Sequence, residues 1–336
     1  MMVVTICDLA LAGANAEPLV LEARFADTAP IVDGTLDDAA WRAAKPIHVA
    51  VHQPPTRNRT TDTIVQLRAV RTDRDIYFAA QWRDPTDSDR KELWTYDGRH
   101  WRRDPHDDED RLALLFPIGD SLSWFDSGGC GRTCHVRRRD RLSLDDAPRW
   151  YKSTLAESQR LDVWHWKSVR SNALGHADDK FWAFHPPMDP RKNGGRYADA
   201  RDGEIKPAVK NVSADKSGPA FMQNPNRVPG IAGVLLASDA VPLDLGSFEA
   251  GDTVPGRVLS VPTGSQSDVR ARGLHRDGAW HLELSRALDT THADDAIFRP
   301  GARIAFSLAV FDNVPESRKQ DHGKATGRLV LWLRKD

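Results

Sequence analysis

Two cysteines and a histidine lie within one short glycine-rich stretch, residues 128–135 (GGCGRTCH). The c-type haem attachment signal is C-x-x-C-H, and the spacing here is C-x-x-x-C-H, one residue longer. Two thiols can add across the vinyl groups of a haem, and the histidine that follows can then ligate the iron. We therefore expect one covalent haem on Cys130 and Cys134, with His135 as an axial ligand. The alternatives are a disulfide within this loop or half of a zinc site.

A second stretch, residues 161–170 (LDVWHWKSVR), places an imidazole between two indoles and a lysine directly after them. In a helix, His165 and Val169 would share a face. In a strand, His165 and Lys167 would share a face and both tryptophans would point the other way. Either geometry can present His165 to a haem, so we take it as the preferred sixth ligand. The alternative is a tryptophan-rich core segment with a hydrogen-bonded histidine.

The sixth ligand has competitors elsewhere in the chain. Met222 is the first of them, because it follows a small, apolar stretch. A thioether ligand would raise the reduction potential relative to two histidines, although ordinary packing also explains a methionine in a loop. The remaining candidates are Met188, Lys167 in its deprotonated form, His176 and His185.

Two charged runs flank these stretches. Residues 137–139 (RRR) could neutralise haem propionates or dock an acidic redox partner; a solvated basic loop is the alternative. Residues 106–110 (HDDED) lack the glycine and the spaced ligands of a calcium loop, so we expect a charged surface turn there.

The composition excludes some classes of function. The net charge of the 336 residues is −1, which gives no case for a nucleic-acid partner. We expect no membrane span, because no apolar run is long enough. Tryptophan is abundant, with 11 residues against 4 tyrosines. That excess suits aromatic walls around a flat group, and also an ordinary core.

Residues 1–16 are mostly apolar and end in a small-x-small sequence, Ala14-Asn15-Ala16, which predicts a signal peptide. A start site placed too far downstream would explain why the segment has no basic beginning and contains Asp8. Removal of the peptide would take Cys7 away, leaving only the two motif cysteines. Haem is attached to cysteine pairs in such an exported compartment, so we expect a periplasmic protein.

Residues 17–336 are predicted to form a single, mainly β domain, an antiparallel β-sandwich. Residues 35–44 should form a short helix capped by Asp37 or Thr35, and the stretch from about 117 to 229 reads as a long irregular insertion that a bound cofactor would order. The expected strands are residues 19–25, 31–32, 47–52, 63–72, 76–82, 111–116, 257–261, 269–275, 279–285, 303–311 and 327–334.

Three blocks together resemble a known family. Residues 31–41 (IVDGTLDDAAW) resemble the start of the ethylbenzene dehydrogenase-related haem-binding domain, an opening shared with family 9 carbohydrate-binding modules. Residues 162–170, with Asp178 and Asp179 after them, look like the c-type cytochrome branch of that family, and the 130–135 motif completes the pattern. The resemblance implies an immunoglobulin-like β-sandwich holding one haem in loops at its edge.

Members with non-covalent haem serve as electron-transfer subunits of molybdenum enzymes, with methionine and lysine at the iron. The covalent motif departs from that ligand pair, because His135 should take one axial place. We therefore expect a periplasmic c-type cytochrome without catalytic turnover of its own. Its partner would be a redox protein, either a molybdenum oxidoreductase or another cytochrome. The alternatives are a carbohydrate-binding module with Cys130 and Cys134 in a disulfide, and an open-site haem sensor.

Overall fold

The computed structural model describes residues 17–52, 62–104, 108–119, 133, 136–137, 150–186, 194–227, 233–314, 322–325 and 327–336. The predicted signal peptide, Cys130, Cys134, His135 and Met188 lie outside the described residues.

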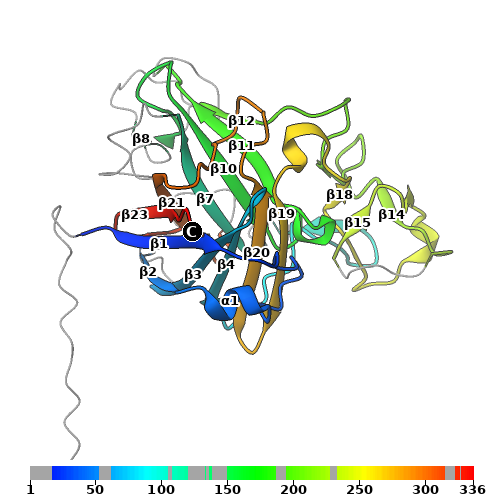
Figure 1. Ribbon diagram of the computed structural model, residues 1–336. Helices are drawn as coiled ribbons and strands as arrows, with labels where there is room; N and C mark the ends of the chain where they lie inside the picture. Colours follow the sequence, from blue (N-terminus) through cyan, green and yellow to red (C-terminus); the bar gives the residue numbers. More distant parts are fainter. Residues whose placement is uncertain are drawn as a thin grey trace, which may run out of the picture.

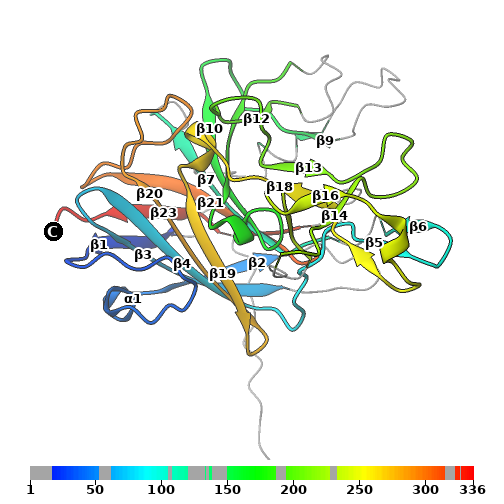
Figure 2. The same cartoon turned by 90° about the vertical axis from the view of Figure 1, so that its right-hand side faces the viewer.

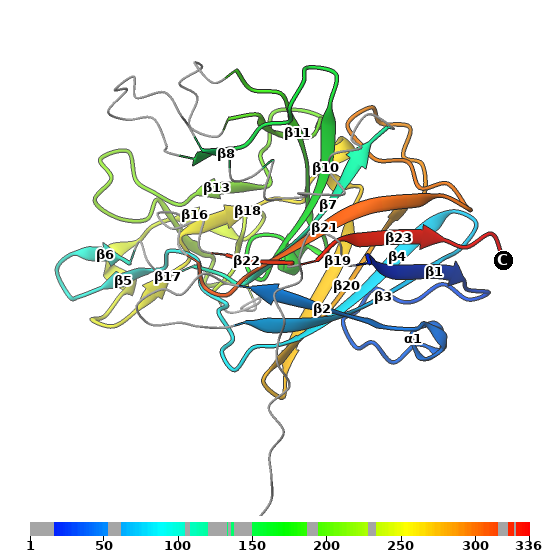
Figure 3. The same cartoon turned by 90° about the vertical axis from the view of Figure 1, so that its left-hand side faces the viewer.

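The described strands form a 13-stranded sheet that folds over into two layers (Figures 1 and 3). Its strand order is β12-β11-β10-β7-β21-β22-β2-β3-β4-β20-β19, and the parallel pair β1 and β23 joins β3 to β21. The fold is therefore mainly β, as predicted. The strands are β1 (Leu19–Phe25), β2 (Ile47–His52), β3 (Thr63–Arg71), β4 (Asp75–Arg83), β7 (Arg111–Ile118), β10 (Arg160–Lys167), β11 (Asp178–Ala183), β12 (Arg196–Ala198), β19 (Arg270–Arg276), β20 (Ala279–Ala287), β21 (Arg303–Phe311), β22 (Gly323–Ala325) and β23 (Leu329–Leu333).

Aromatic side chains fill the space between the two layers. Trp166 of β10 packs edge-on against Trp280 of β20, with ring centroids 4.9 Å apart, and against Trp82 of β4 at 6.1 Å. Trp164 meets Phe78 of β4 at 5.6 Å in the same manner. Edge-to-face contacts of this kind add to the stabilisation from burying the rings. The core thus joins β10 to the opposite layer.

Smaller sheets lie beside the main one, as Figure 2 shows around β18. Among the described helices, none is long and apolar enough to cross a membrane. The additional elements are β5 (Trp94–Tyr96), β6 (Trp101–Arg103), β8 (Val136–Arg137), β9 (Trp150–Tyr151), β13 (Ala208–Lys210), β14 (Phe221–Gln223), β15 (Leu235–Leu236), β16 (Ala240–Pro242), β17 (Thr253–Val254), β18 (Arg257–Leu259), helix α1 (Ala39–Ala43), and the 3-10 turns η1 (Asn172–Leu174), η2 (Leu245–Ser247) and η3 (Gly264–Ser267).

The predicted strand at residues 31–32 does not form, because the backbone N–H of Ile31 donates to the Asp38 side chain and not to a neighbouring strand. The next two residues are bound by a different side chain. The backbone N–H groups of Asp33 and Gly34 donate to Glu283 Oε2, and the indole of Trp41 donates to Glu283 Oε1. One buried carboxylate of β20 therefore holds the segment that carries the family-like opening.

The helix predicted for residues 35–44 forms as α1, but its cap differs. Asp38 is the N-cap, and its carbonyl accepts from the N–H groups of Trp41 and Arg42. The hydroxyl of Thr35 instead donates to Asp37, so the two predicted caps bond to each other.

The stretch 117–229 is more regular than its sequence indicates. It contains β10 and β11, which pair antiparallel across six residues, and β10 also pairs with β7 across eight. The β12 strand pairs with β11 in turn, so the irregular insertion predicted from about residue 117 holds three strands of the main sheet.

Gly273 of β19 is a position where the core leaves no room for a side chain. A Cβ there would lie 2.4 Å from Cζ2 of the buried Trp166. We expect Gly273→Ala to lower the free energy of unfolding by about 1–3 kcal/mol, because the indole must shift within a packed core. Gly327→Ala is the matched control, since a Cβ there meets no atom within 4 Å. Equal chemical-denaturation curves for the two variants would contradict this packing.

Candidate functional site

Strand β10 presents two chemically different faces, and this decides between the two predicted geometries. The segment is extended, Trp164 and Trp166 lie fully buried in the sandwich core, and His165 and Lys167 lie on the opposite face. Alternation along a strand requires this division. The extended alternative is therefore confirmed, and the histidine is not part of the tryptophan core.

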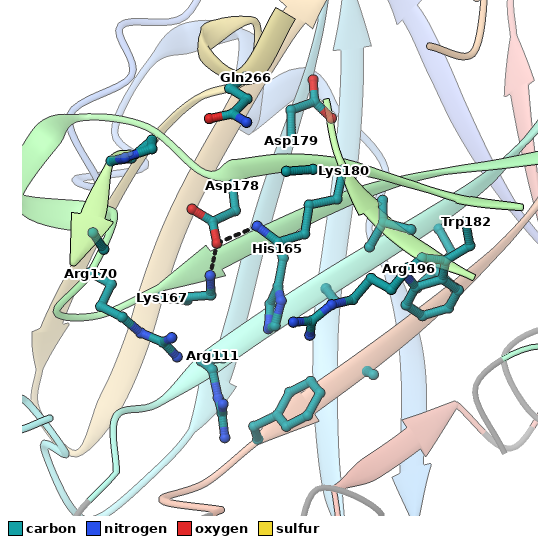
Figure 4. Close-up of a pocket in the computed structure, with 18 of the residues that line it drawn as sticks. Arg111, His165, Lys167, Arg170, Asp178, Asp179, Lys180, Trp182, Arg196 and Gln266 are labelled. Carbon is teal, nitrogen blue, oxygen red and sulfur yellow. Dashed lines mark hydrogen bonds and ion pairs between the residues drawn. The ribbon is translucent and has the colours of Figure 1, made fainter. Parts of the chain in front are cut away.

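A cavity of about 480 Å³ lies on this second face. Its floor is formed by outward residues of β7, β10, β11 and β21, among them Ala113, Val163, Trp182 and Phe311. Loops on either side of these strands complete the wall (Figure 4). Cavities of roughly 300–1,000 Å³ with an apolar floor and few polar groups are typical of cofactor and ligand sites.

His165 stands in the floor of this cavity. Its ring lies 5.4 Å from the ring of Phe311, and its Nε2 atom is buried without a hydrogen-bond partner among the described residues. Burial, and then the positive charge of Lys167, lower the pKa of His165 well below its ordinary value. The imidazole is therefore neutral at physiological pH, which is the form that binds a metal.

Lys167 lies beside His165 and is held by a carboxylate. Its ammonium contacts Asp178, which also accepts a hydrogen bond of 2.6 Å from Lys180 Nζ (Figure 4). Burial and the neighbouring cations, first among them Lys180, lower the pKa of Lys167 well below its ordinary value. As a ligand, Lys167 would have to leave Asp178, whereas His165 gives up no hydrogen bond at Nε2.

The acidic run at residues 106–110 was predicted to be a surface turn, and that prediction is wrong for its described part. Asp108, Glu109 and Asp110 are each at most 1% exposed. Glu109 accepts hydrogen bonds from the N–H groups of Val169 and Arg170 and pairs with the Arg170 guanidinium. Burial alone would raise the pKa of Glu109, but the adjacent cations, first among them Arg170, lower it to about 2. The run therefore fixes the chain directly after β10.

Basic side chains dominate the cavity wall, and among them only Lys167 was predicted from the sequence as a site residue. They come from strands and loops that are far apart in the chain, so no local motif marks them. Eight cationic residues line the cavity against Asp178 and Asp179: Arg111, Lys152, Lys167, Arg170, Lys180, Arg196, Arg201 and Lys206. Such a wall favours a ligand that carries negative charge.

One residue of the cysteine motif is described, and it lies close to the cavity. Thr133 is fully buried, and its carbonyl accepts a hydrogen bond of 2.9 Å from Ser153 N. Ser153 directly follows Lys152, which lines the cavity. The chain between Cys130 and Cys134 is thus tied at Thr133 to the wall of the His165 cavity.

The other predicted sixth ligands are placed differently. Met222 lies in β14 and is not among the described residues that line the cavity; its sulfur accepts a hydrogen bond of 3.3 Å from Asp244 N. His176 is also absent from the described lining. His185 is fully buried, with its backbone N–H bonded to Ser153. The structure therefore brings His165 and Lys167 to one cavity and leaves Met222 outside it.

The tryptophans serve chiefly as core. Seven of the nine whose side chains are described are buried, and only Trp182 lines the cavity among them. The exceptions are Trp101, which packs with Tyr96 and Phe248, and Trp332, which lies between Arg303 and Arg334.

Comparisons with known proteins match the chain to one sequence family and to solved structures of low identity. The sequence model of the family described as ethylbenzene dehydrogenase matches residues 38–323. A family 9 carbohydrate-binding module from Caldicellulosiruptor kristjanssonii, solved with glucose, is similar at 10% identity and a TM-score of 0.31, covering 95% of this chain and 98% of that chain. Its structure with cellotriose is similar at 10% identity and a TM-score of 0.33, covering 95% and 96%. No curated protein sequence matches the chain.

Proposed function

Because the chain belongs to the ethylbenzene dehydrogenase family, we propose that it is a periplasmic c-type cytochrome that carries single electrons. Cys130 and Cys134 would hold the haem covalently, and His135 and His165 would bind its iron. The haem would supply a one-electron iron couple. The chain's own residues bind it, orient it and limit access to the iron.

One observation carries this proposal: His165, whose pKa is lowered well below its ordinary value, stands in a cofactor-sized cavity, and its Nε2 atom is buried without a hydrogen-bond partner among the described residues. A buried polar atom without a partner costs free energy. Iron ligation would give His165 Nε2 the partner that the described residues do not supply. The ring of Phe311 limits the orientations of the imidazole.

Two further features of the cavity support the same group. Thr133 ties the cysteine motif to the cavity wall beside Lys152, so the attachment residues and His165 could serve one haem. The cationic wall suits the two carboxylates of a haem, and Asp178 keeps Lys167 from competing for the iron. The apolar part of the floor, including Val163 and Trp182, suits the macrocycle.

With both axial places filled by histidine, no substrate needs to reach the iron. We therefore infer electron transfer rather than catalysis. The partner would be another redox protein, either a molybdenum oxidoreductase or a second cytochrome, and export would follow from the segment at residues 1–16.

The test is covalent haem on the full chain matured in a periplasm with haem-attachment machinery. We expect a denaturing gel to stain for haem, and the intact mass to exceed the polypeptide mass by one haem. Cys130→Ser combined with Cys134→Ser should abolish both signals, because no thioether can then form. Cys7→Ser is the matched control and should leave both unchanged, since Cys7 precedes the predicted cleavage site.

A colourless protein of polypeptide mass that binds oligosaccharides would overturn the proposal in favour of a carbohydrate-binding module. If the protein carries covalent haem and its reduced form binds carbon monoxide at full occupancy, the sixth position of the iron is open. The protein would then be an open-site haem sensor and not an electron carrier.

A further inference from the structure

We propose that the buried carboxylates of Asp162, Asp179, Asp199 and Asp295 form a calcium site inside the sandwich, separate from the proposed haem site. Asp162 lies on β10 and Asp179 on the neighbouring β11. Asp179 points away from the Asp178–Lys180 side of its strand, as Figure 4 shows. The Asp179 carboxylate therefore leaves β11 on the opposite face from Asp178, although Asp179 also borders the His165 cavity.

The spacing of the carboxylates suits a large, hard cation. One oxygen from each of Asp162, Asp179 and Asp295 lies within 4.8 Å of the others. Two oxygens on opposite sides of a calcium ion, each about 2.4 Å from it, are about 4.8 Å apart. All three residues are at most 2% exposed, so their own side chains would replace most of the water around the ion.

The unpartnered oxygens are a separate observation that points to a ligand. Asp179 is 1% exposed, yet neither of its carboxylate oxygens has a hydrogen-bond partner among the described residues. The same holds for both oxygens of Asp199 and for Asp162 Oδ1, whereas Asp295 Oδ1 lies 3.1 Å from the Arg286 guanidinium. Buried carboxylate oxygens are ordinarily hydrogen-bonded or bound to metal. Asp162, Asp179 and Asp199 thus offer five such oxygens toward the roughly 6–8 oxygen ligands that calcium takes.

The charge of the cluster also calls for a cation. Arg286 supplies the central positive charge: its Nη1 lies 2.6 Å from Asp162 Oδ2, 3.1 Å from Asp295 Oδ1 and 3.7 Å from Asp179 Oδ2. With all four carboxyls ionised, as calcium binding requires, they and the guanidinium carry a formal charge of −3, and a divalent ion reduces it to −1. Arg286 also donates to the carbonyl of Ala296, so it fixes the loop that carries Asp295.

A second cluster of buried carboxylates differs from the proposed site, because its oxygens have hydrogen-bond partners. In the cluster of Asp84, Asp110 and Asp312, both oxygens of Asp110 accept backbone N–H groups, from Ser88 and Asn313. Asp84 Oδ1 accepts from Thr86. Those oxygens are used by the fold itself, and we assign no ion there.

Protons would compete with calcium for the carboxylate oxygens of the proposed site. Burial, and then the neighbouring acids, raise the pKa of Asp199 to about 9 and that of Asp295 to about 7. A raised carboxyl pKa means that the apo protein loses stability as pH rises from the unfolded value of 3.8 toward these values. Calcium must displace these protons, so its affinity should increase with pH. The other titratable groups near the cluster are Asp178, Lys180, Asp268, His292 and Asp294.

The test is binding of calcium alone to the chelator-treated full chain, by calorimetric titration and thermal unfolding. We expect saturable binding of one ion and a Tm that rises with calcium concentration. The rise should be larger near pH 8 than near pH 6, because fewer carboxyls then carry protons. Magnesium should bind more weakly, because it retains its water and demands octahedral geometry. None of these readouts depends on haem.

Asp179→Asn keeps the shape of the side chain and removes a ligand charge. Mutating residues that only hydrogen-bond to the ligands of a metal already lowers metal affinity by about 10–100-fold. For the loss of a direct ligand charge we therefore expect calcium to bind at least about tenfold more weakly. Asp199→Asn is the second variant, should the first fail to fold, with the near-ultraviolet dichroism spectrum as the folding check. Asp312→Asn, in the other acidic cluster, is the matched control and should bind as the parent does. If neither chelator nor calcium changes the Tm of the parent protein at either pH, the proposal of a calcium site is wrong. The buried carboxyls would then be protonated and would bind no ion.

Discussion

In the mature haem-loaded protein, His165→Ala is expected to turn a low-spin absorption spectrum into a high-spin one. Two nitrogen ligands give a low-spin iron, and removal of one leaves the sixth position open. The change is expected because Lys167 is held by Asp178 and Met222 lies outside the described lining of the cavity, while His322, which also lines it, is stacked on Phe311 at 4.3 Å. Absorption and near-infrared magnetic dichroism spectra measure the outcome.

Two controls test whether the spectral change comes from the loss of the His165 imidazole itself. Exogenous imidazole should restore the low-spin spectrum, because the cavity left by His165→Ala has room for it. His176→Ala removes another partly buried histidine, which lies outside the described lining, and should leave the spectrum unchanged. If the His165→Ala protein keeps its low-spin signals and Met222→Ala loses them, the methionine is the ligand and the carrier proposal needs a different loop arrangement.

The strands of the sandwich could be predicted where one face is buried and the other meets solvent. In β2, Val49 and Val51 are 1% exposed, and the residues between and beside them are exposed. That pattern fixes both the type and the bounds of the element. The bounds predicted for β1 and β2 agree with the structure for this reason. Those of β21 also agree, although five consecutive residues of that strand are buried.

The middle of the chain resisted prediction because its strands bury both faces. In β10 the tryptophans face the core, and the other face carries His165 and Lys167 in the cavity, so neither face has an exposed, plainly polar signature. A strand that is buried on both sides lacks the alternation that sequence reasoning relies on.

Only some of the residues of the candidate site could be predicted from the sequence. The side chain of His165 could be identified, since an imidazole between indoles is unusual. The burial of Asp108 and Glu109 could not, because their partners Lys91 and Arg170 lie elsewhere in the chain. An acidic run is ordinarily solvated, and only tertiary contacts reveal when it is not.

Arg286→Met is expected to lower the free energy of unfolding by about 3–5 kcal/mol near neutral pH, measured with chelator present. Arg286 is 1% exposed, its guanidinium lies 4.8 Å from the Trp164 ring, and it is 2.6 Å from Asp162 Oδ2. Methionine keeps much of the volume but leaves the buried carboxylates without their counter-charge. Arg303→Met is the matched control: that residue is exposed and stacks on Trp332 at 4.3 Å, so its loss should cost only about 0.5–1 kcal/mol.

The pH dependence of this loss separates charge from packing. Burial raises the pKa of Asp162 and, further, that of Asp179, and removal of Arg286 raises both again. At acid pH the carboxyls are protonated in folded and unfolded chains alike, so the cost of Arg286→Met should shrink as pH falls toward about 4 and grow as pH rises. Adding Asp162→Asn to Arg286→Met should then recover part of the loss at neutral pH, since it removes one uncompensated charge. A loss that is constant across pH would mean that Arg286 acts through its packing on Trp164 and Phe298 and that the carboxyls around it are neutral in the folded protein.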